Sequence, residues 1–211
     1  MAESASKSKM TSLAKMPSAA ASSGAASAGY QAKPGNTGAN AGTTGLEISD
    51  EGVPVYNQKD DQWKKRILER QFTIGQFGCA VTSTAMSLSK ISGNNITPEE
   101  MDQYLDDHHG YRKEMIIWDI AATKIGTTAS CLYQKDNKAT IDSSLEAGHP
   151  CVISVNGKMH WVCVAGRNAD GSYIIHDPEG GKIVGGKWDD ASKCVLVDGY
   201  QAGTELRTFG V

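Results

Sequence analysis

The order of local patterns constrains the fold of this chain more than any other feature. Helix signals come first, in four segments that cover residues 79–91, 97–107, 115–125 and 140–147. Runs rich in β-branched and apolar residues follow, over residues 150–155, 160–165, 173–177 and 193–198. Helices followed by an antiparallel sheet are typical of α+β domains. The sequence therefore predicts an α+β fold.

Three smaller features complete this prediction. A short strand is expected over residues 53–56, well before the first helix. A hairpin is expected across residues 168–171, which join two of the later strands. The glycine pairs at residues 180–181 and 185–186 predict two turns around a short strand.

The first 45 residues differ from the rest of the chain in composition. They are rich in Ala, Ser, Gly and Thr, and apart from alanine they contain few apolar residues. Such a segment cannot bury enough apolar surface to offset the entropy lost on ordering. Residues 1–45 are therefore predicted to form a disordered tail, and residues 46–211 a single globular domain.

The net charge and the length of the apolar runs bear on whether the protein binds nucleic acid or crosses a membrane. The net charge is −3, and the four lysines and one glutamate of residues 1–45 leave −6 for the remainder. An acidic domain argues against a nucleic-acid surface. No apolar run has the length of a membrane span or of a signal peptide. We therefore expect no membrane span and synthesis in the cytoplasm.

The five cysteines stand at wide spacings, and their odd number does not suggest a disulfide framework. There is no Cys-x-x-Cys or Cys-x-x-His pair, so neither a structural zinc site nor another cofactor is expected. Cys79 differs from the others because it follows Gly78 at the start of a predicted helix. A thiol with a pKa of about 8.5 is only a few per cent ionised at neutral pH, and a helix N-terminus stabilises the thiolate. Cys79 is therefore the candidate nucleophile.

His160 is the candidate base because it begins an otherwise apolar strand. Asp177 ends the strand that the predicted hairpin pairs with it, so the carboxylate could meet and orient the imidazole. A non-catalytic reading gives each a structural role, as a buried histidine and as the first residue of a turn before proline. The developing oxyanion would need donors, such as the backbone N–H of Cys79 and a glutamine amide. Gln58 and Gln76 are both available, and spacing alone does not choose between them.

Several short motifs follow one another along residues 53–197. They are Val53-Pro54-Val55-Tyr56-Asn57-Gln58, Trp63, Gly78-Cys79-Ala80-Val81-Thr82-Ser83, Ala85-Met86, Thr97-Pro98, Trp118, Gly148-His149-Pro150, His160-Trp161-Val162, Gly166 and Asp177-Pro178. In this order they resemble the bacteriocin-processing, double-glycine type of cysteine peptidase domain, in a free-standing relative without a transporter. The resemblance implies a papain-like fold.

The resemblance also implies roles for residues of this chain. Cys79 would be the nucleophile, His160 the base and Asp177 its orienting partner, with an upstream glutamine in the oxyanion hole. The Tyr-x-Gln context of the free-standing relatives favours Gln58 over Gln76. Two departures stand out. Many relatives carry Gly-Pro after the cysteine, where this chain has Ala80-Val81, and transporter-linked members place the glutamine where this chain has a threonine.

These observations predict a cysteine endopeptidase that cleaves protein or peptide substrates after small or glycine residues. The expected setting is a bacterial or phage effector toxin, delivered into a target cell by a secretion system or phage particle, with an immunity protein as a second partner. One alternative is a peptidoglycan amidase or endopeptidase with the same Cys-His chemistry. Another is a catalytically silent papain-like binding module.

Overall fold

The computed structural model describes residues 46–133, 137–180 and 182–210. The predicted disordered tail lies outside these residues. The described part contains helices and an antiparallel sheet in the predicted order, so the α+β fold is confirmed.

A seven-stranded antiparallel sheet forms one part of the domain, with strand order β10-β9-β8-β7-β6-β11-β5. Its strands are β5 (Ala129–Leu132), β6 (Cys151–Val155), β7 (His160–Arg167), β8 (Tyr173–Asp177), β9 (Lys182–Asp189), β10 (Cys194–Val197) and β11 (Leu206–Phe209). Two-stranded hairpins add β1 (Ile67–Leu68) with β2 (Phe72–Thr73), and β3 (Tyr111–Arg112) with β4 (Met115–Ile116).

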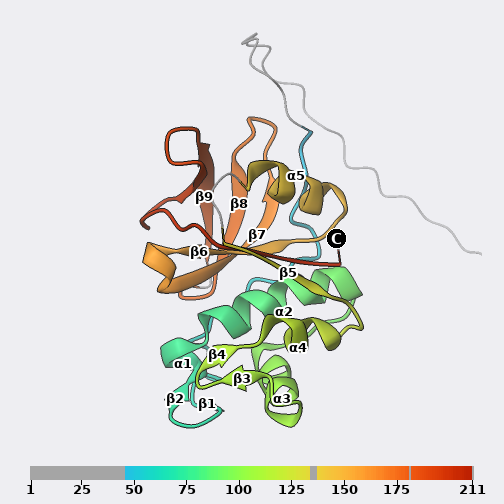
Figure 1. The fold of residues 1–211 in the computed structure, drawn as a ribbon, viewed down its shortest axis with the longest axis vertical. Coiled ribbons are helices and arrows are strands. Elements are labelled where there is room, and N and C mark those ends of the chain that lie inside the picture. Colours follow the sequence, from blue (N-terminus) through green and yellow to red (C-terminus); the bar gives the residue numbers. More distant parts are fainter. Residues whose placement is uncertain (1–45, 134–136, 181, 211) are drawn as a thin grey trace, which may run out of the picture. The chain divides into compact units, whose positions relative to one another are not determined.

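The helices are α1 (Ile74–Phe77), α2 (Cys79–Ser92), α3 (Pro98–Asp107), α4 (Trp118–Thr123) and α5 (Lys138–Glu146), and a 3-10 turn, η1, covers Asn156–Lys158. Helix α3 begins with a capping box, in which the Thr97 hydroxyl accepts from the N–H of Glu100 and the Glu100 carboxylate accepts from the N–H of Thr97. Helices α1 to α4 gather on one side of the sheet (Figure 1).

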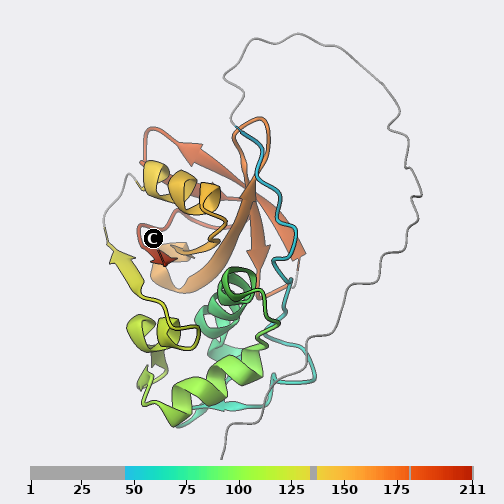
Figure 2. The same ribbon diagram turned by 90° about the vertical axis from the view of Figure 1, so that its right-hand side faces the viewer.

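Helices α2 and α5 pack against opposite faces of the sheet, as Figure 2 also shows. Met86 of α2 packs with Cys163 of β7. Leu145 of α5 belongs to the cluster that holds Val162 and Val164 of the same strand. Alternate residues of a strand point to opposite faces. The sheet is therefore covered on both sides along β7, the strand that begins with His160.

The predicted strand at residues 53–56 is wrong, because this segment is irregular in the structure. Pro54 has no N–H to donate to a ladder. The N–H of Val53 donates to Asp50 in a turn, and that of Tyr56 donates to the sulfur of Met86. The segment is thus held by contacts with α2 and by its own turn rather than by a neighbouring strand.

Two other predictions are corrected. The expected helix over residues 115–125 begins only at Trp118, because Met115 and Ile116 pair with β3 in a hairpin whose turn has Lys113 at φ 57°. Gly185 and Gly186 do not form a turn, because both lie within β9 and pair with Ile174 and Tyr173 of β8. The short strand expected there is instead one of eight residues.

Candidate active site

Cys79 is the first residue of α2 and is partly exposed. Gly78 joins α1 to α2, and its N–H donates to the carbonyl oxygen of Ile74 at 2.7 Å. A Cβ at position 78 would lie 2.4 Å from that same oxygen, closer than any real contact. Glycine therefore allows the tight junction that brings Cys79 to a helix start, where free N–H groups favour a thiolate.

His160 and Asp177 meet at the beginning of β7 and the end of β8. The Nε2 atom of His160 lies 2.9 Å from Oδ1 of Asp177, and the two residues are 6% and 1% exposed. Cys79 is close enough to His160 to raise the pKa of the imidazole. Because Asp177 engages Nε2, Nδ1 is the atom left for the sulfur. The structure thus brings together the three residues singled out in the sequence.

The pKa of His160 reflects two opposing effects. Burial alone would lower it, but the hydrogen bond to Asp177 and the nearby Cys79 outweigh burial and raise the pKa to about 9. Burial raises the pKa of Asp177, and the bonds from His160, Tyr200 and the backbone N–H of Glu179 bring it below its usual value. At neutral pH the arrangement therefore favours an imidazolium between a carboxylate and the sulfur.

The two candidate glutamines occupy different places. Gln58 is 4% exposed. Its side-chain Nε2 donates to the carbonyl oxygen of Gly75 at 3.3 Å, and its backbone N–H donates to the carbonyl oxygen of Pro178 at 2.7 Å. It therefore bridges the segment before Cys79 and the turn after Asp177. Gln76 is exposed, and its Oε1 accepts the N–H of Thr73 to cap α1.

Comparison with known families agrees with this geometry. Residues 51–202, more than two thirds of the chain, match the model of the Peptidase_C39-like family. The chain belongs to this family. None of the curated proteins compared with the chain matches it. Family membership indicates a papain-like α+β fold, cysteine peptidase activity and protein substrates.

Tyr200 is a member of this site that sequence reasoning missed. In the Peptidase_C39-like domain its hydroxyl donates to Oδ2 of Asp177 at 2.5 Å, and its ring stacks on His160 at 5.1 Å between ring centroids. Tyr200 follows Gly199 in a loop after β10. A single tyrosine in a loop carries no periodic pattern or motif, so no local signal could have identified it.

His176 and three of the other cysteines lie in settings unlike that of Cys79 and His160. His176 is fully buried, with Nε2 2.9 Å from Oδ2 of Asp50, and so ties β8 to the N-terminal segment. Burial raises the pKa values of the Cys131, Cys151 and Cys163 thiols. These three thiols are held protonated more strongly than a free cysteine.

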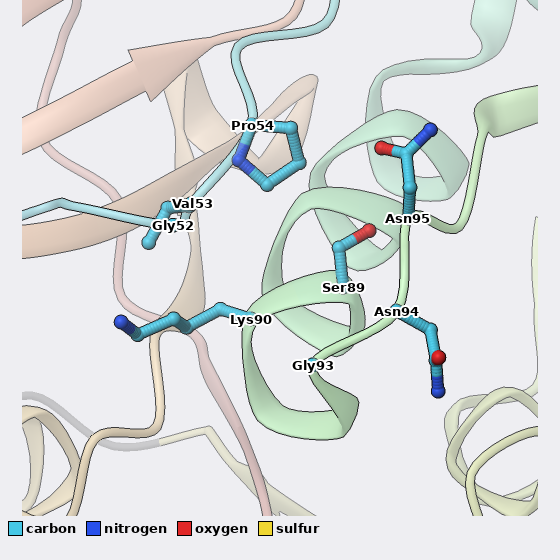
Figure 3. Close-up of a pocket in the computed structure, with 8 residues that line it drawn as sticks. All are labelled: Gly52, Val53, Pro54, Ser89, Lys90, Gly93, Asn94 and Asn95. Atoms are coloured by element: carbon cyan, nitrogen blue, oxygen red, sulfur yellow. The ribbon is translucent and has the colours of Figure 1, made fainter. Parts of the chain in front are cut away.

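A pocket of about 460 Å³ lies elsewhere on the Peptidase_C39-like domain (Figure 3). It is bounded by residues 52–54, by Ser89 and Lys90 near the end of α2, and by residues 93–95 just after the helix. At 1.5 Å per residue the 14-residue helix is about 20 Å long, so the pocket is remote from Cys79. Cys79 lies at the other end of the helix.

Within residues 46–133, 137–180 and 182–210, no three or more acidic, histidine or cysteine side chains form a group that could hold a metal ion. In the same part of the chain, none of the helices combines the length and the apolar character that crossing a membrane requires.

Proposed function

We propose that this Peptidase_C39-like domain is a cysteine endopeptidase in which Cys79, His160 and Asp177 act together. The observation that carries the proposal is the chain of contacts from Asp177 through His160 to a cysteine at a helix start. Each contact has the direction that nucleophilic catalysis needs, because the carboxylate orients the imidazole and the imidazolium faces the sulfur.

In the first half-reaction the Cys79 thiolate attacks the carbonyl carbon of the scissile peptide bond. The C–S bond forms, and the carbonyl electron pair moves to oxygen to give a tetrahedral oxyanion. His160 then gives its Nδ1 proton to the leaving amine as the C–N bond breaks. An acyl-enzyme thioester and a free amine result.

In the second half-reaction a water molecule attacks the thioester. Neutral His160 accepts a proton from this water at Nδ1, and the collapsing intermediate releases the carboxylic acid product and the thiolate. The imidazolium–thiolate pair is then restored. Asp177 keeps Nε2 engaged in both steps, so Nδ1 stays directed toward the reacting atoms.

For the oxyanion we propose the backbone N–H of Cys79 and the side-chain amide of Gln58. An N–H in the first turn of a helix has no partner within the helix. Gln58 is buried beside the segment that leads to Cys79, and only one of its two amide hydrogens is used by Gly75. Gln76 is the weaker candidate because it is exposed and its side chain is held at the start of α1 by the bond from the Thr73 N–H.

We further propose cleavage after a small residue or glycine, which the family resemblance suggests, within proteins of a target cell. Expression of the wild type and of Cys79→Ala in a bacterial cytoplasm, followed by mapping of new protein N-termini, tests both points. New termini preceded by small residues should appear only with the wild type. Cys131→Ala, which removes another partly exposed thiol, should behave as the wild type does.

Two results would contradict the proposal. Identical N-termini and growth in wild-type and Cys79→Ala cells, together with release of fragments from purified sacculi by the wild type, would indicate a cell-wall hydrolase. A Cys79 that iodoacetamide alkylates no faster than Cys131 would indicate a silent binding module.

A further inference from the structure

We propose that Tyr200 is a positioning residue, whose hydroxyl fixes the carboxylate that orients the catalytic histidine. The inference rests on the proposed function and extends it to a residue in a loop outside the helix and the paired strands that carry the triad. It is supported by three independent features of the structure, namely the donors to Asp177, the ring contact with His160 and the anchoring of the Tyr200 loop.

The Asp177 carboxylate accepts three hydrogen bonds. Its Oδ1 accepts from His160 Nε2 at 2.9 Å and from the N–H of Glu179 at 2.8 Å. Its Oδ2 accepts from the Tyr200 hydroxyl at 2.5 Å, and the described residues supply no second donor to this oxygen. Loss of the hydroxyl would leave an oxygen of a buried carboxylate unpaired and free the carboxylate to rotate.

The aromatic ring of Tyr200 contacts the imidazole as well. The two rings lie 5.1 Å apart between centroids with an interplanar angle of 30°, so the phenol covers one face of His160. One side chain therefore touches both the base and its orienting partner. This double contact limits rotation of both groups about their side-chain bonds.

The loop that carries Tyr200 is itself tied to the His160 hairpin. The N–H of Tyr200 donates to Val197 at the end of β10. The carbonyl oxygen of Gln201 accepts from Asn156 in the turn between β6 and β7, which leads into His160. Gly203 packs against Ser154 so closely that a Cβ would lie 1.6 Å from its carbonyl oxygen. The loop is thus held on both sides of Tyr200, by β10 and by the turn that leads into His160.

The charges around Tyr200 keep it a neutral donor. Burial raises its pKa, and the hydrogen bond to Asp177 and the charge of Glu179 raise it further. The Glu179 carboxylate is paired with Lys59 at 2.6 Å. The hydroxyl therefore keeps its proton throughout the pH range in which His160 titrates.

The test uses Tyr200→Phe, which keeps the ring and removes the hydroxyl. Alkylation of Cys79 by iodoacetamide is followed against pH by mass spectrometry, a measurement that needs no substrate. Because a carboxylate that is no longer held in place orients the imidazolium less well, we expect alkylation at pH 6.5 to slow by about three- to tenfold and its midpoint to move to higher pH. On a mapped substrate, kcat should fall while KM is unchanged.

Tyr173→Phe is the matched control, because the Tyr173 hydroxyl donates to Asp142 at 2.8 Å, near α5 and away from the catalytic triad. It should change thermal stability but neither the alkylation profile nor kcat. If Tyr200→Phe does not fold, Tyr200→Gln and Tyr200→Leu replace it. Cys79 should then be alkylated faster in the glutamine variant, which retains a hydrogen-bond donor, than in the leucine variant.

The outcomes separate the two proposals. Unchanged or faster alkylation of Cys79 in a folded Tyr200→Phe, with a reactive wild type, would overturn the positioning role and leave the peptidase intact. A wild-type Cys79 no more reactive than Cys131 would overturn the proposed function and, with it, this inference.

Discussion

The Ser83 hydroxyl of α2 donates a 3.0 Å hydrogen bond to the carbonyl oxygen of Trp161 in β7. The helix that begins with Cys79 is therefore tied directly to the strand that begins with His160. Ser87, one turn further along α2, makes a second tie to Pro150 before β6 at 2.6 Å. Small polar side chains on the buried face of α2 thus tie the helix to the sheet, and Ser83 does so next to His160.

Ser83→Ala should impair catalysis more than its effect on stability explains. Each serine bond contributes about 1 kcal/mol, so Ser83→Ala and Ser87→Ala should lower the free energy of unfolding by similar amounts. Only Ser83→Ala loosens the strand next to His160, and we expect kcat/KM to fall about three- to tenfold in that variant alone. Denaturant unfolding and peptidase assays check this. Equal activity loss in both variants would contradict it.

Asp177→Asn should move the alkaline limb of the pH–activity profile. His160 must be protonated to supply the leaving amine, so activity should fall as pH rises through its pKa of about 9. The Asp177 bond raises this pKa, and its loss should therefore shift the limb toward lower pH. The maximal rate should also fall by at least about tenfold.

Asp142→Asn is the control for this profile, since Asp142 binds Arg167 rather than a catalytic residue. Its alkaline limb should coincide with that of the wild type. An Asp177→Asn limb at the wild-type pH would show that the carboxylate does not support the imidazolium.

Gln58→Ala and Gln76→Ala distinguish the two glutamines. If Gln58 donates to the oxyanion, its removal should lower kcat about 10²- to 10³-fold with little change in KM. Gln76→Ala removes a cap of α1 and should cost about 1 kcal/mol of stability with activity retained. The reverse pattern in steady-state kinetics would reassign the oxyanion donor to Gln76.

Gly78→Ala should lower the reactivity of Cys79. The added Cβ would collide with the backbone of Ile74, so the start of α2 must shift. We expect alkylation of Cys79 to slow at least about tenfold, because the thiolate loses its place at the helix N-terminus and beside His160.

Gly93→Ala at the opposite end of α2 is the control. Gly93 has φ 69° and open space around its Cα, so alanine there should cost about 1–2 kcal/mol through backbone strain alone. Alkylation of Cys79 should be unaffected. A Gly78→Ala variant that alkylates as fast as Gly93→Ala would contradict the steric argument.

Features that depend on near neighbours in the chain could be predicted. The start of α2 at Cys79 follows from Gly78 and the apolar periodicity after it, and the capping box of α3 follows from Thr97 and Glu100. The approach of Asp177 to His160 follows from a short connection between adjacent strands, since such a connection makes antiparallel neighbours.

The sequence-based predictions were wrong where pairing with another strand decided the local structure. Met115 and Ile116 are compatible with a helix, but pairing with Tyr111 and Arg112 places them in a strand. Gly185 and Gly186 suggest turns, yet β8 and β10 flank them and hold them extended. Local preference is weak compared with a ladder of hydrogen bonds on both sides.

The sequence alone determined the class of fold, the helix start that selects Cys79 and the strand positions of His160 and Asp177. Only the tertiary structure decided that Tyr200 completes the site and that Gln58, rather than Gln76, is buried beside it. The physical reason is that caps and periodicity are set by residues within a few positions of one another. The contacts of Gln58 and Tyr200 join segments distant in sequence, and the paths of the intervening loops appear only once the whole core has packed.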